Sequence, residues 1–340
     1  MKLEEFNYDL PRELIAQHPA ACRDQSRLLH VSLDQDQLED RVFCDVINYL
    51  NPGDVLVLNE TKVIPARIMG RRAGGGKAEI YLLDRLDGDN WKVLARPGRK
   101  IRIGDVIAFD DPDIKAEIIG NGEEGVKTVV FHYTGIWEEH LDRIGTVPLP
   151  PYIKEYDGDP DRYQTVYASL PGSVAAPTAG LHFTDELLKA IEEKGIAIAK
   201  VNLKVGLGTF RPVEAENIED HKMHEEYYEV SSESAALINS RREAGGRVIA
   251  VGTTSTRTLE TVADKNGHMT AAAGWTNSYI YPGYHFKIVD GLITNFHLPK
   301  SSLLMLVSAL AGKNKIFNAY EHAIAEKYRF FSFGDAMLIL

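Results

Sequence analysis

The 340-residue chain contains little cysteine and no long hydrophobic run. Its only cysteines, Cys22 and Cys44, do not form a Cys-x-x-Cys motif, so the sequence indicates neither a disulfide framework nor a cysteine-ligated zinc site. The most apolar stretch, residues 303–311, is about half as long as the roughly 20 residues that cross a bilayer. The first residues lack the apolar core of a secretory signal. We therefore expect a cytoplasmic protein without membrane association.

Several motifs of nucleotide-binding enzymes are also missing. The segment VGLGTF (205–210) has a Gly-x-Gly pair but lacks the third glycine and the following helix of a dinucleotide-binding fingerprint. No Gly-x-x-x-x-Gly-Lys-Ser/Thr sequence occurs. These absences disfavour a Rossmann oxidoreductase, an ordinary class I methyltransferase and a P-loop kinase. The segment HKMHEE (221–226) has two histidines three residues apart but is not the HExxH zinc motif, and we expect no metal.

Positive charge is scarce overall but concentrated in one segment. The net charge is −11, which argues against a surface that is positive throughout. Between Ala66 and Arg102, however, ten lysines and arginines stand against four acidic residues. A local basic patch of this kind is compatible with nucleic-acid binding.

The same segment differs from its flanks in secondary-structure pattern. Residues 67–149 contain short runs rich in isoleucine, valine and aromatic residues, separated by clusters such as DGDN and GNGEEG, which predicts a small all-β, barrel-like domain. The proline-rich TVPLPPYI (146–153) ends it as a stiff connector. Strand and helix patterns alternate on both sides, which indicates an α/β fold. We therefore expect a discontinuous α/β catalytic domain, residues 1–66 and 150–340, with the β domain inserted.

One strand-to-helix junction has the composition of an anion site. In VIAVGTTSTRTLE (248–260), a buried strand runs into Thr253, Thr254 and Ser255, and the following helix contains Arg257. Backbone N–H groups, hydroxyls and a guanidinium would converge there on an anion. The alternative interpretation is that the hydroxyls only cap the helix.

Two histidines lie at comparable loop-to-helix junctions. His182 in AAPTAGLHFT precedes a helix that Thr184 can cap, and His297 follows an apolar strand and Asn295. Loops at the carboxyl ends of strands are where α/β folds place their sites, which favours proton transfer by these histidines. A structural role, with the imidazole fixing its loop, is the alternative. Asp335 precedes the last hydrophobic strand and is either a second candidate or a turn residue.

At these stretches the chain closely resembles the S-adenosylmethionine:tRNA ribosyltransferase-isomerase family of queuosine biosynthesis. The matching segments follow one another along essentially the whole chain: YDLPRELIAQHP, LVLNETKVIPARI, PLPPYI, RYQTVYA, AAPTAGLHFT, VGLGTFRPV, HKMHEE, VIAVGTTSTRTLE, YPGY, TNFHLPKSSLLMLVSALAG and YRFFSFGDAMLI. The departures are conservative: Glu60 and Lys62 replace the usual Asp and Arg, and Ser302 replaces Thr.

The resemblance implies a specific reaction and fold. Members of the family transfer and isomerise the ribosyl group of S-adenosyl-L-methionine onto 7-aminomethyl-7-deazaguanine in the wobble position of tRNA, giving epoxyqueuosine and releasing adenine and methionine. The resemblance also implies an α/β domain with an inserted β-barrel. It further implies that the protein binds no metal and is a monomer without an obligate protein partner. The partner is therefore a tRNA carrying 7-aminomethyl-7-deazaguanine.

This chemistry suggests a role for each candidate residue. The sulfonium acidifies the neighbouring C5′ protons, adenine leaves more easily when protonated, and the attacking amine must be neutral, so the reaction needs proton transfer. The candidate catalytic residues are His182 and His297, with Asp335 and Glu225 as alternatives. The expected substrate-binding residues are Thr253, Thr254, Ser255, Arg257 and Asn295. The expected tRNA-binding residues are Arg67, Arg71, Arg72, Arg99 and Lys100.

Two other functions remain open from the sequence. A non-catalytic tRNA-binding protein would use the basic segment equally well, but it would leave the loop histidines and the 252–257 junction unexplained. A Rossmann-like methyltransferase would use the same cosubstrate, and the missing glycine motif argues against it. The products separate the three, since only the proposed reaction releases adenine and methionine.

Overall fold

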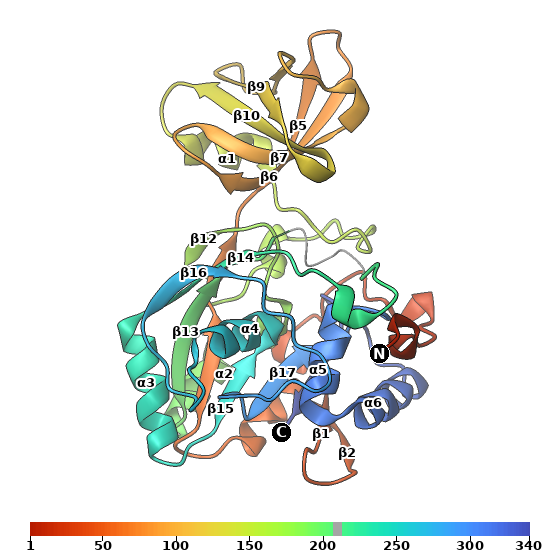
Figure 1. Ribbon diagram of the computed structural model, residues 1–340, viewed down its shortest axis with the longest axis vertical. Helices are drawn as coiled ribbons and strands as arrows, with labels where there is room; N and C mark the ends of the chain where they lie inside the picture. Colours follow the sequence, from red (N-terminus) through yellow and green to blue (C-terminus); the bar gives the residue numbers. More distant parts are fainter. Residues whose placement is uncertain (207–212) are drawn as a thin grey trace. The chain divides into compact units, whose positions relative to one another are not determined.

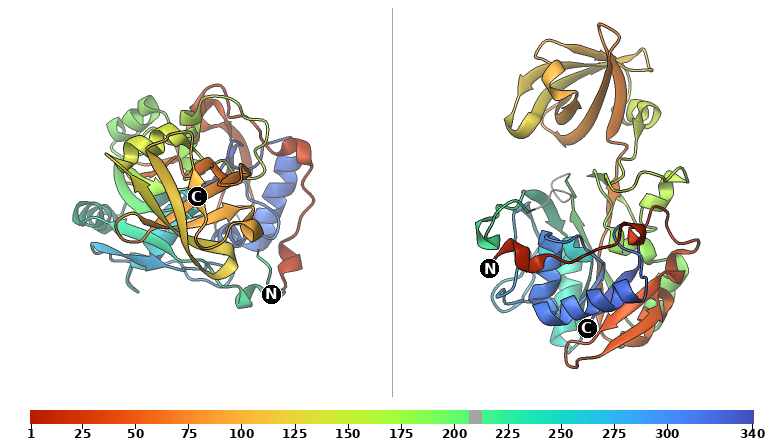
Figure 2. Two further views of the ribbon diagram at one scale, coloured as in Figure 1. Left: turned by 90° about the horizontal axis from the view of Figure 1, so that it is seen from above. Right: turned by 90° about the vertical axis from the view of Figure 1, so that its right-hand side faces the viewer.

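The structure is a computed structural model that describes residues 1–206 and 213–340, so the last four residues of VGLGTF lie outside the described residues (Figure 1). The chain divides into two compact units, which can be followed in Figures 1 and 2. The sheet unit consists of Met1–Lys62, Pro150–Leu170 and Ala176–Leu340. The barrel unit consists of Val63–Leu149 and Pro171–Ala175. The predictions of an α/β region and an all-β region are confirmed.

The sheet unit is built on a nine-stranded mixed sheet with the order β16-β14-β13-β3-β15-β17-β18-β1-β2. Strands β13, β3, β15 and β17 are parallel, β18 is antiparallel to β17, and β1 is parallel to β18. Strands β14, β16 and β2 pair antiparallel at the two margins. Their bounds are β1 (Arg27–Val31), β2 (Leu38–Val42), β3 (Val55–Asn59), β13 (Ala197–Leu203), β14 (Glu226–Val230), β15 (Val248–Val251), β16 (Ala272–Thr276), β17 (Gly291–Asn295) and β18 (Ala336–Ile339). A separate two-stranded sheet contains β4 (Thr61–Val63) and β12 (Leu170–Ser173).

Helical segments cover both faces of this sheet because its central strands are apolar on both sides. Alternate residues of β3 enter different cores: Val55 and Val57 belong to one apolar cluster, and Leu56 and Leu58 to the other. The first cluster includes residues of α3 (Ser232–Glu243), α4 (Gly252–Val262), α5 (Ser302–Ala311) and α6 (Lys313–Ala325). The second includes residues of η4 (Phe43–Tyr49), η8 (Thr178–His182) and α2 (Asp185–Glu193). The central strands are therefore buried between two helical layers.

The barrel unit is an all-antiparallel sheet that closes on itself. Strands β5, β6, β7, β10, β9 and β8 pair in that order, and β8 pairs back to β5. Their bounds are β5 (Arg67–Arg72), β6 (Lys77–Arg85), β7 (Asn90–Arg96), β8 (Val106–Ala108), β9 (Ile114–Asn121) and β10 (Val126–Tyr133), followed by α1 (Trp137–Ile144) and β11 (Gly145–Thr146). Buried and accessible residues alternate along β7, as expected of a strand with one face in a core. Trp91 and Trp137 pack in that core with ring centroids 5.5 Å apart.

Strand directions bring a set of polar residues to one edge of the nine-stranded sheet. The carboxyl ends of β3, β15 and β17 meet there because these strands are parallel. The amino ends of β18 and β1 reach the same edge because β18 runs antiparallel to β17. We call this the polar edge, and it is marked by Asn59, Gly252, Asn295, Asp335 and Ser26, which are contributed by distant parts of the chain.

Candidate active site

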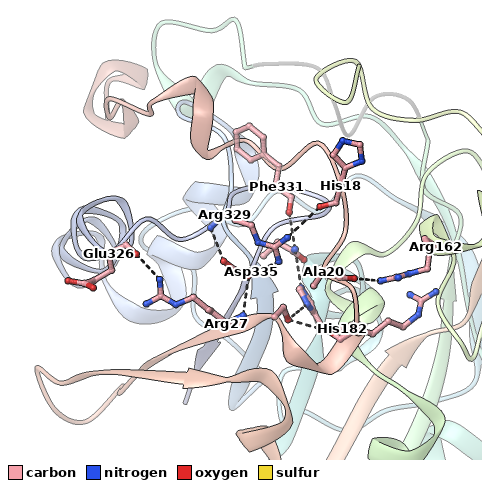
Figure 3. Close-up of polar contacts among 12 residues, drawn as sticks. His18, Ala20, Arg27, Arg162, His182, Glu326, Arg329, Phe331 and Asp335 are labelled. Atoms are coloured by element: carbon pink, nitrogen blue, oxygen red, sulfur yellow. Dashed lines mark hydrogen bonds and ion pairs between the residues drawn. The ribbon is translucent and has the colours of Figure 1, made fainter. Parts of the chain in front are cut away.

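The short helix η8 lies against the polar edge, in contact with β17 and the start of α4, and it ends at His182 (Figure 3). Its imidazole is buried, with 4% of the residue exposed. The ring stacks on Phe43 at a centroid distance of 4.9 Å and an interplanar angle of 26°. Thr184, immediately after the loop, caps α2 by accepting a hydrogen bond from the backbone N–H of Leu187, as predicted. The helix therefore does not depend on the imidazole for its cap.

Hydrogen bonds at both ring nitrogens fix the tautomer of His182. The Asn295 side-chain amide donates to the carbonyl of Phe331 at 3.0 Å, and its second proton points to Nε2 of His182 at 3.2 Å. Nε2 is therefore the acceptor, and the ring proton lies on Nδ1. Nδ1 lies 2.7 Å from the Ser26 hydroxyl, which in turn donates to the carbonyl of Arg23 at 3.3 Å. The neutral imidazole thus keeps its lone pair on Nε2, where it accepts the hydrogen bond from Asn295.

Burial determines the charge of this histidine. Desolvation lowers the pKa of His182 to about 4, while the nearby carboxylate of Asp335 opposes the shift. The ring is therefore neutral at physiological pH. A neutral imidazole at the edge of a pocket can accept a proton. With so low a pKa, the imidazolium that forms is a strong acid and readily donates the proton again.

Asp335 acts as a hub of hydrogen bonds at the polar edge. Its carboxylate is 1% exposed and accepts from the backbone N–H of Arg27 at 3.1 Å and of Arg329 at 2.8 Å. The Arg329 guanidinium adds a third bond at 2.9 Å. The carboxylate joins the starts of β1 and β18 and contributes negative charge near His182 (Figure 3). This arrangement suits a positioning residue.

A pocket opens beside His182 in the sheet unit. Its lining includes Arg23, Ser26, Arg162, Leu181, His182 and Ser332. The two arginines were not among the residues that the sequence pointed to, although Arg162 lies in the RYQTVYA segment that matches the family. The pocket therefore combines a neutral imidazole with two cationic side chains.

His297 lies two residues after the end of β17, the strand that ends at Asn295, and is also buried. Its backbone N–H donates to the Tyr320 hydroxyl at 2.8 Å, and its carbonyl accepts from the Tyr8 hydroxyl. The ring Nε2 lies 3.0 Å from the Thr294 hydroxyl, and burial lowers the pKa of His297 to about 3. It is not among the residues that line the pocket beside His182. These contacts anchor the loop that follows β17.

The predicted anion junction forms the first turn of α4. Thr253, Thr254, Ser255 and Arg257 are all buried, and within the described residues the Thr254 and Ser255 hydroxyls and Nη2 of Arg257 have no hydrogen-bond partner. Gly252 has a φ of +85°, and a Cβ there would lie 3.5 Å from the Thr254 hydroxyl. Unpartnered buried polar groups are costly unless a ligand satisfies them.

The Arg257 charge is already balanced by a buried carboxylate. Nη1 of Arg257 donates to Glu226 at the start of β14, and Nε donates to the carbonyl of Ser278 at 3.0 Å. The candidate Glu225 is exposed and directly precedes β14. Its neighbour Glu226, which forms the ion pair with Arg257, is buried, with 5% of the residue exposed.

The predicted RNA-binding cations lie in the barrel unit: Arg67, Arg71, Arg72, Arg99 and Lys100. Arg67 is paired with Glu79 at 2.6 Å, but the other four form no ion pair with any described residue. Nη1 of Arg72 donates to the carbonyl of Lys100 at 3.3 Å, which joins the end of β5 to η5 (Gly98–Lys100). Arg71 is the register partner of Lys77 across β5 and β6. Like charges opposite each other are unfavourable without a counter-anion.

The described part of the chain shows neither a metal-binding group nor a membrane-spanning helix. No group of three histidine, cysteine or acidic side chains there is arranged to hold a metal ion. Among the same residues, no helix has the length and apolar composition needed to span a membrane.

Comparisons with known proteins place these features in context. Residues 3–339 match the family model described as "Queuosine biosynthesis protein". A curated S-adenosylmethionine:tRNA ribosyltransferase-isomerase from Acetivibrio thermocellus is 56% identical over 340 residues, all of both chains. The chain in the crystal structure of an S-adenosylmethionine tRNA ribosyltransferase from Thermotoga maritima is 40% identical in sequence to this chain. The match covers 99% of this chain and 100% of that chain, with a TM-score of 0.57.

Proposed function

Because the chain belongs to the queuosine biosynthesis protein family, we propose that it transfers and isomerises the ribosyl group of S-adenosyl-L-methionine onto 7-aminomethyl-7-deazaguanine in the wobble position of tRNA. The chain is a transferase, and S-adenosylmethionine is its substrate. The products of the proposed reaction are epoxyqueuosine in the tRNA, adenine and methionine. We further propose that it works in the cytoplasm as a monomer.

The observation that supports this most is the neutral His182 beside a cationic pocket at the polar edge. The proposed reaction begins when a base removes a C5′ proton that the sulfonium has acidified, and Nε2 of His182 would be that base once the substrate displaces the Asn295 N–H that it accepts in this structure. Removal leaves a carbanion at C5′, whose rearrangement expels adenine. A proton on Nε2 has a low pKa and can pass to the departing adenine. Oδ1 of Asn295 is buried without a partner in the described part of the chain and would accept a hydrogen bond from substrate.

The first turn of α4 is the proposed site for the methionine part of the cosubstrate. The Thr254 and Ser255 hydroxyls and Nη2 of Arg257, which have no hydrogen-bond partner among the described residues, are donors that a carboxylate would satisfy. Since Glu226 already balances the guanidinium charge, binding there would depend mainly on hydrogen bonds and the helix N-terminus. His297 and Glu225 stay candidates for further proton transfers.

The barrel, proposed as an insertion at residues 67–149 in the α/β domain, is the part that would bind the tRNA backbone. Its unpaired cations Arg71, Arg72, Arg99 and Lys100 provide charge that phosphates would neutralise. The proposal needs only local charge, which explains how a protein with a net charge of −11 can bind RNA.

Product analysis tests the proposal directly. The purified protein is mixed with S-adenosylmethionine and a tRNA that carries 7-aminomethyl-7-deazaguanine, and with the unmodified tRNA as control. Release of adenine and methionine with the modified tRNA alone supports the proposal. S-Adenosylhomocysteine would instead identify a methyltransferase, and tRNA binding without any product would identify a binding protein.

A further inference from the structure

Arg23 and Arg162 line the pocket beside His182, and neither forms an ion pair with a described carboxylate. Both belong to the sheet unit, Arg23 from η3 (Arg23–Gln25) and Arg162 from η7 (Pro160–Tyr163). Neither guanidinium is within 4.0 Å of any described carboxylate, although the exposed Asp159 and Asp161 lie in the same loop region. The pocket therefore contains two cations without a direct counter-ion.

Hydrogen bonds to backbone carbonyls hold both guanidinium groups in place. Arg23 donates to the carbonyls of Leu181 and Asp161, each at 3.1 Å. Arg162 donates to the carbonyls of Ala20 at 2.7 Å and Ala21 at 3.2 Å, as Figure 3 shows for Ala20. Carbonyls orient a guanidinium but do not cancel its charge. Each group keeps N–H donors to spare, since a guanidinium has five.

The two charges are close enough to affect each other. Burial, and after it the neighbouring charge of Arg162, lowers the pKa of Arg23, while the charges of Asp159 and Asp161 oppose the shift. Nε of Arg162 is buried without a partner among the described residues. Two positive groups held near each other at a pocket are unfavourable unless an anion joins them.

We infer that Arg23 and Arg162 form a clamp for an anionic oxygen group of a substrate, which is either a backbone phosphate of the tRNA or the carboxylate of S-adenosylmethionine. This inference rests on the proposed function for the identity of the two substrates. Planar guanidinium groups suit phosphate and carboxylate recognition because they donate paired, charge-assisted hydrogen bonds. Because Arg23 also binds the carbonyl that precedes His182, the clamp would place the anion beside the imidazole.

The test uses Arg162→Met, which keeps the aliphatic stem but removes the charge, and Arg162→Lys, which keeps the charge. Arg41→Met is the matched control, because Arg41 is exposed in β2 and pairs with Glu39. For each variant the apparent KM for tRNA, the apparent KM for S-adenosylmethionine and the salt dependence of tRNA binding are measured. Arg162→Met should raise one KM about tenfold or more, and Arg162→Lys should recover part of it.

The pattern identifies the anion. A phosphate predicts a higher KM for tRNA and a slope of log affinity against log salt that is less steep by about 0.7–0.9. If the anion is the carboxylate of S-adenosylmethionine, the KM for S-adenosylmethionine should rise and the salt slope should stay unchanged. That result would place the carboxylate at this clamp and not at α4. If Arg162→Met is folded and matches Arg41→Met in all three measurements, the inference is wrong.

A second measurement needs no variant. Inorganic phosphate should compete with the same substrate in the unmodified protein, and competition with neither substrate would overturn the clamp even if Arg162→Met did not fold. Salt dependence of tRNA binding and its competition by phosphate are measured without turnover. They therefore remain informative if adenine release, the test of the proposed function, is not observed.

Discussion

Replacement of His182 by glutamine separates a catalytic imidazole from a structural one. The substitution removes the ring that stacks on Phe43 and the N–H directed at Ser26, while glutamine retains an amide that can bond to Asn295. Leaving a buried partner unpaired costs about 1–3 kcal/mol of unfolding free energy. In a unit of this size each kcal/mol lowers Tm by roughly 2–4 °C. The variant should therefore melt several degrees early.

Turnover should fall by much more than that destabilisation can explain. Domains of ordinary stability have about 5–15 kcal/mol to lose, so the variant stays folded at 25 °C. If Nε2 accepts the substrate proton, its loss should reduce kcat about 10²–10⁴-fold, with tRNA affinity close to that of the parent. The assay is adenine release at saturating substrates, on the preparations used for melting.

A control variant destabilises the same site without removing the ring nitrogens. Phe43→Leu removes the stacking partner of His182 and should lower Tm to a similar extent while keeping most of the turnover. If His182→Gln keeps its kcat within about threefold of the parent while folded, the imidazole is a structural element. The base would then be sought at His297, Asp335 or Glu225.

Four further outcomes follow from described contacts. Ser255→Ala should keep or raise Tm, because its hydroxyl is buried without a partner, and should raise the KM for S-adenosylmethionine. Arg257→Lys should also raise the KM for S-adenosylmethionine, although it preserves the positive charge beside Glu226. An increase confined to the KM for tRNA would instead indicate a phosphate site. Ala at both Arg71 and Arg72 should weaken tRNA binding and flatten its salt dependence with little change in Tm; an unaltered slope would remove this patch from the interface. The free energy of unfolding from urea titrations should fall by roughly 3 kcal/mol between pH 6.5 and 4 from His182 alone, since only the unfolded chain binds its proton there; the same fall in His182→Gln would contradict a buried neutral ring.

The fold class was predictable because local patterns and tertiary structure agree. The apolar DVLVLNE became β3, which is buried throughout, and the run of short strands separated by Gly, Asp and Asn became a closed barrel. Thr184 was identified as a helix cap from its place before acidic residues and an apolar run. Each of these inferences depends only on neighbours within a few residues.

The site was less predictable because its chemistry depends on contacts between distant segments. His182 and Asn295 could be found, since both flank strand or helix ends, but the bond between them could not. Arg23 and Arg162 look like ordinary surface arginines until their carbonyl partners are known. The sequence also did not show that Glu226 is buried and paired with Arg257 while Glu225 is exposed, because neighbouring residues at a strand end point in opposite directions.

The positions of the three tryptophans give the two units separate optical signals. Trp91 and Trp137 are buried in the barrel, whereas Trp275 in β16 is 57% exposed. Unfolding of the barrel would transfer two indoles from an apolar to an aqueous environment and shift their emission to longer wavelength, but Trp275 already emits from water. Far-ultraviolet circular dichroism reports mainly on α2 to α6, which all belong to the sheet unit. Recording both signals in one denaturation experiment would show whether the units unfold as one cooperative block or in sequence.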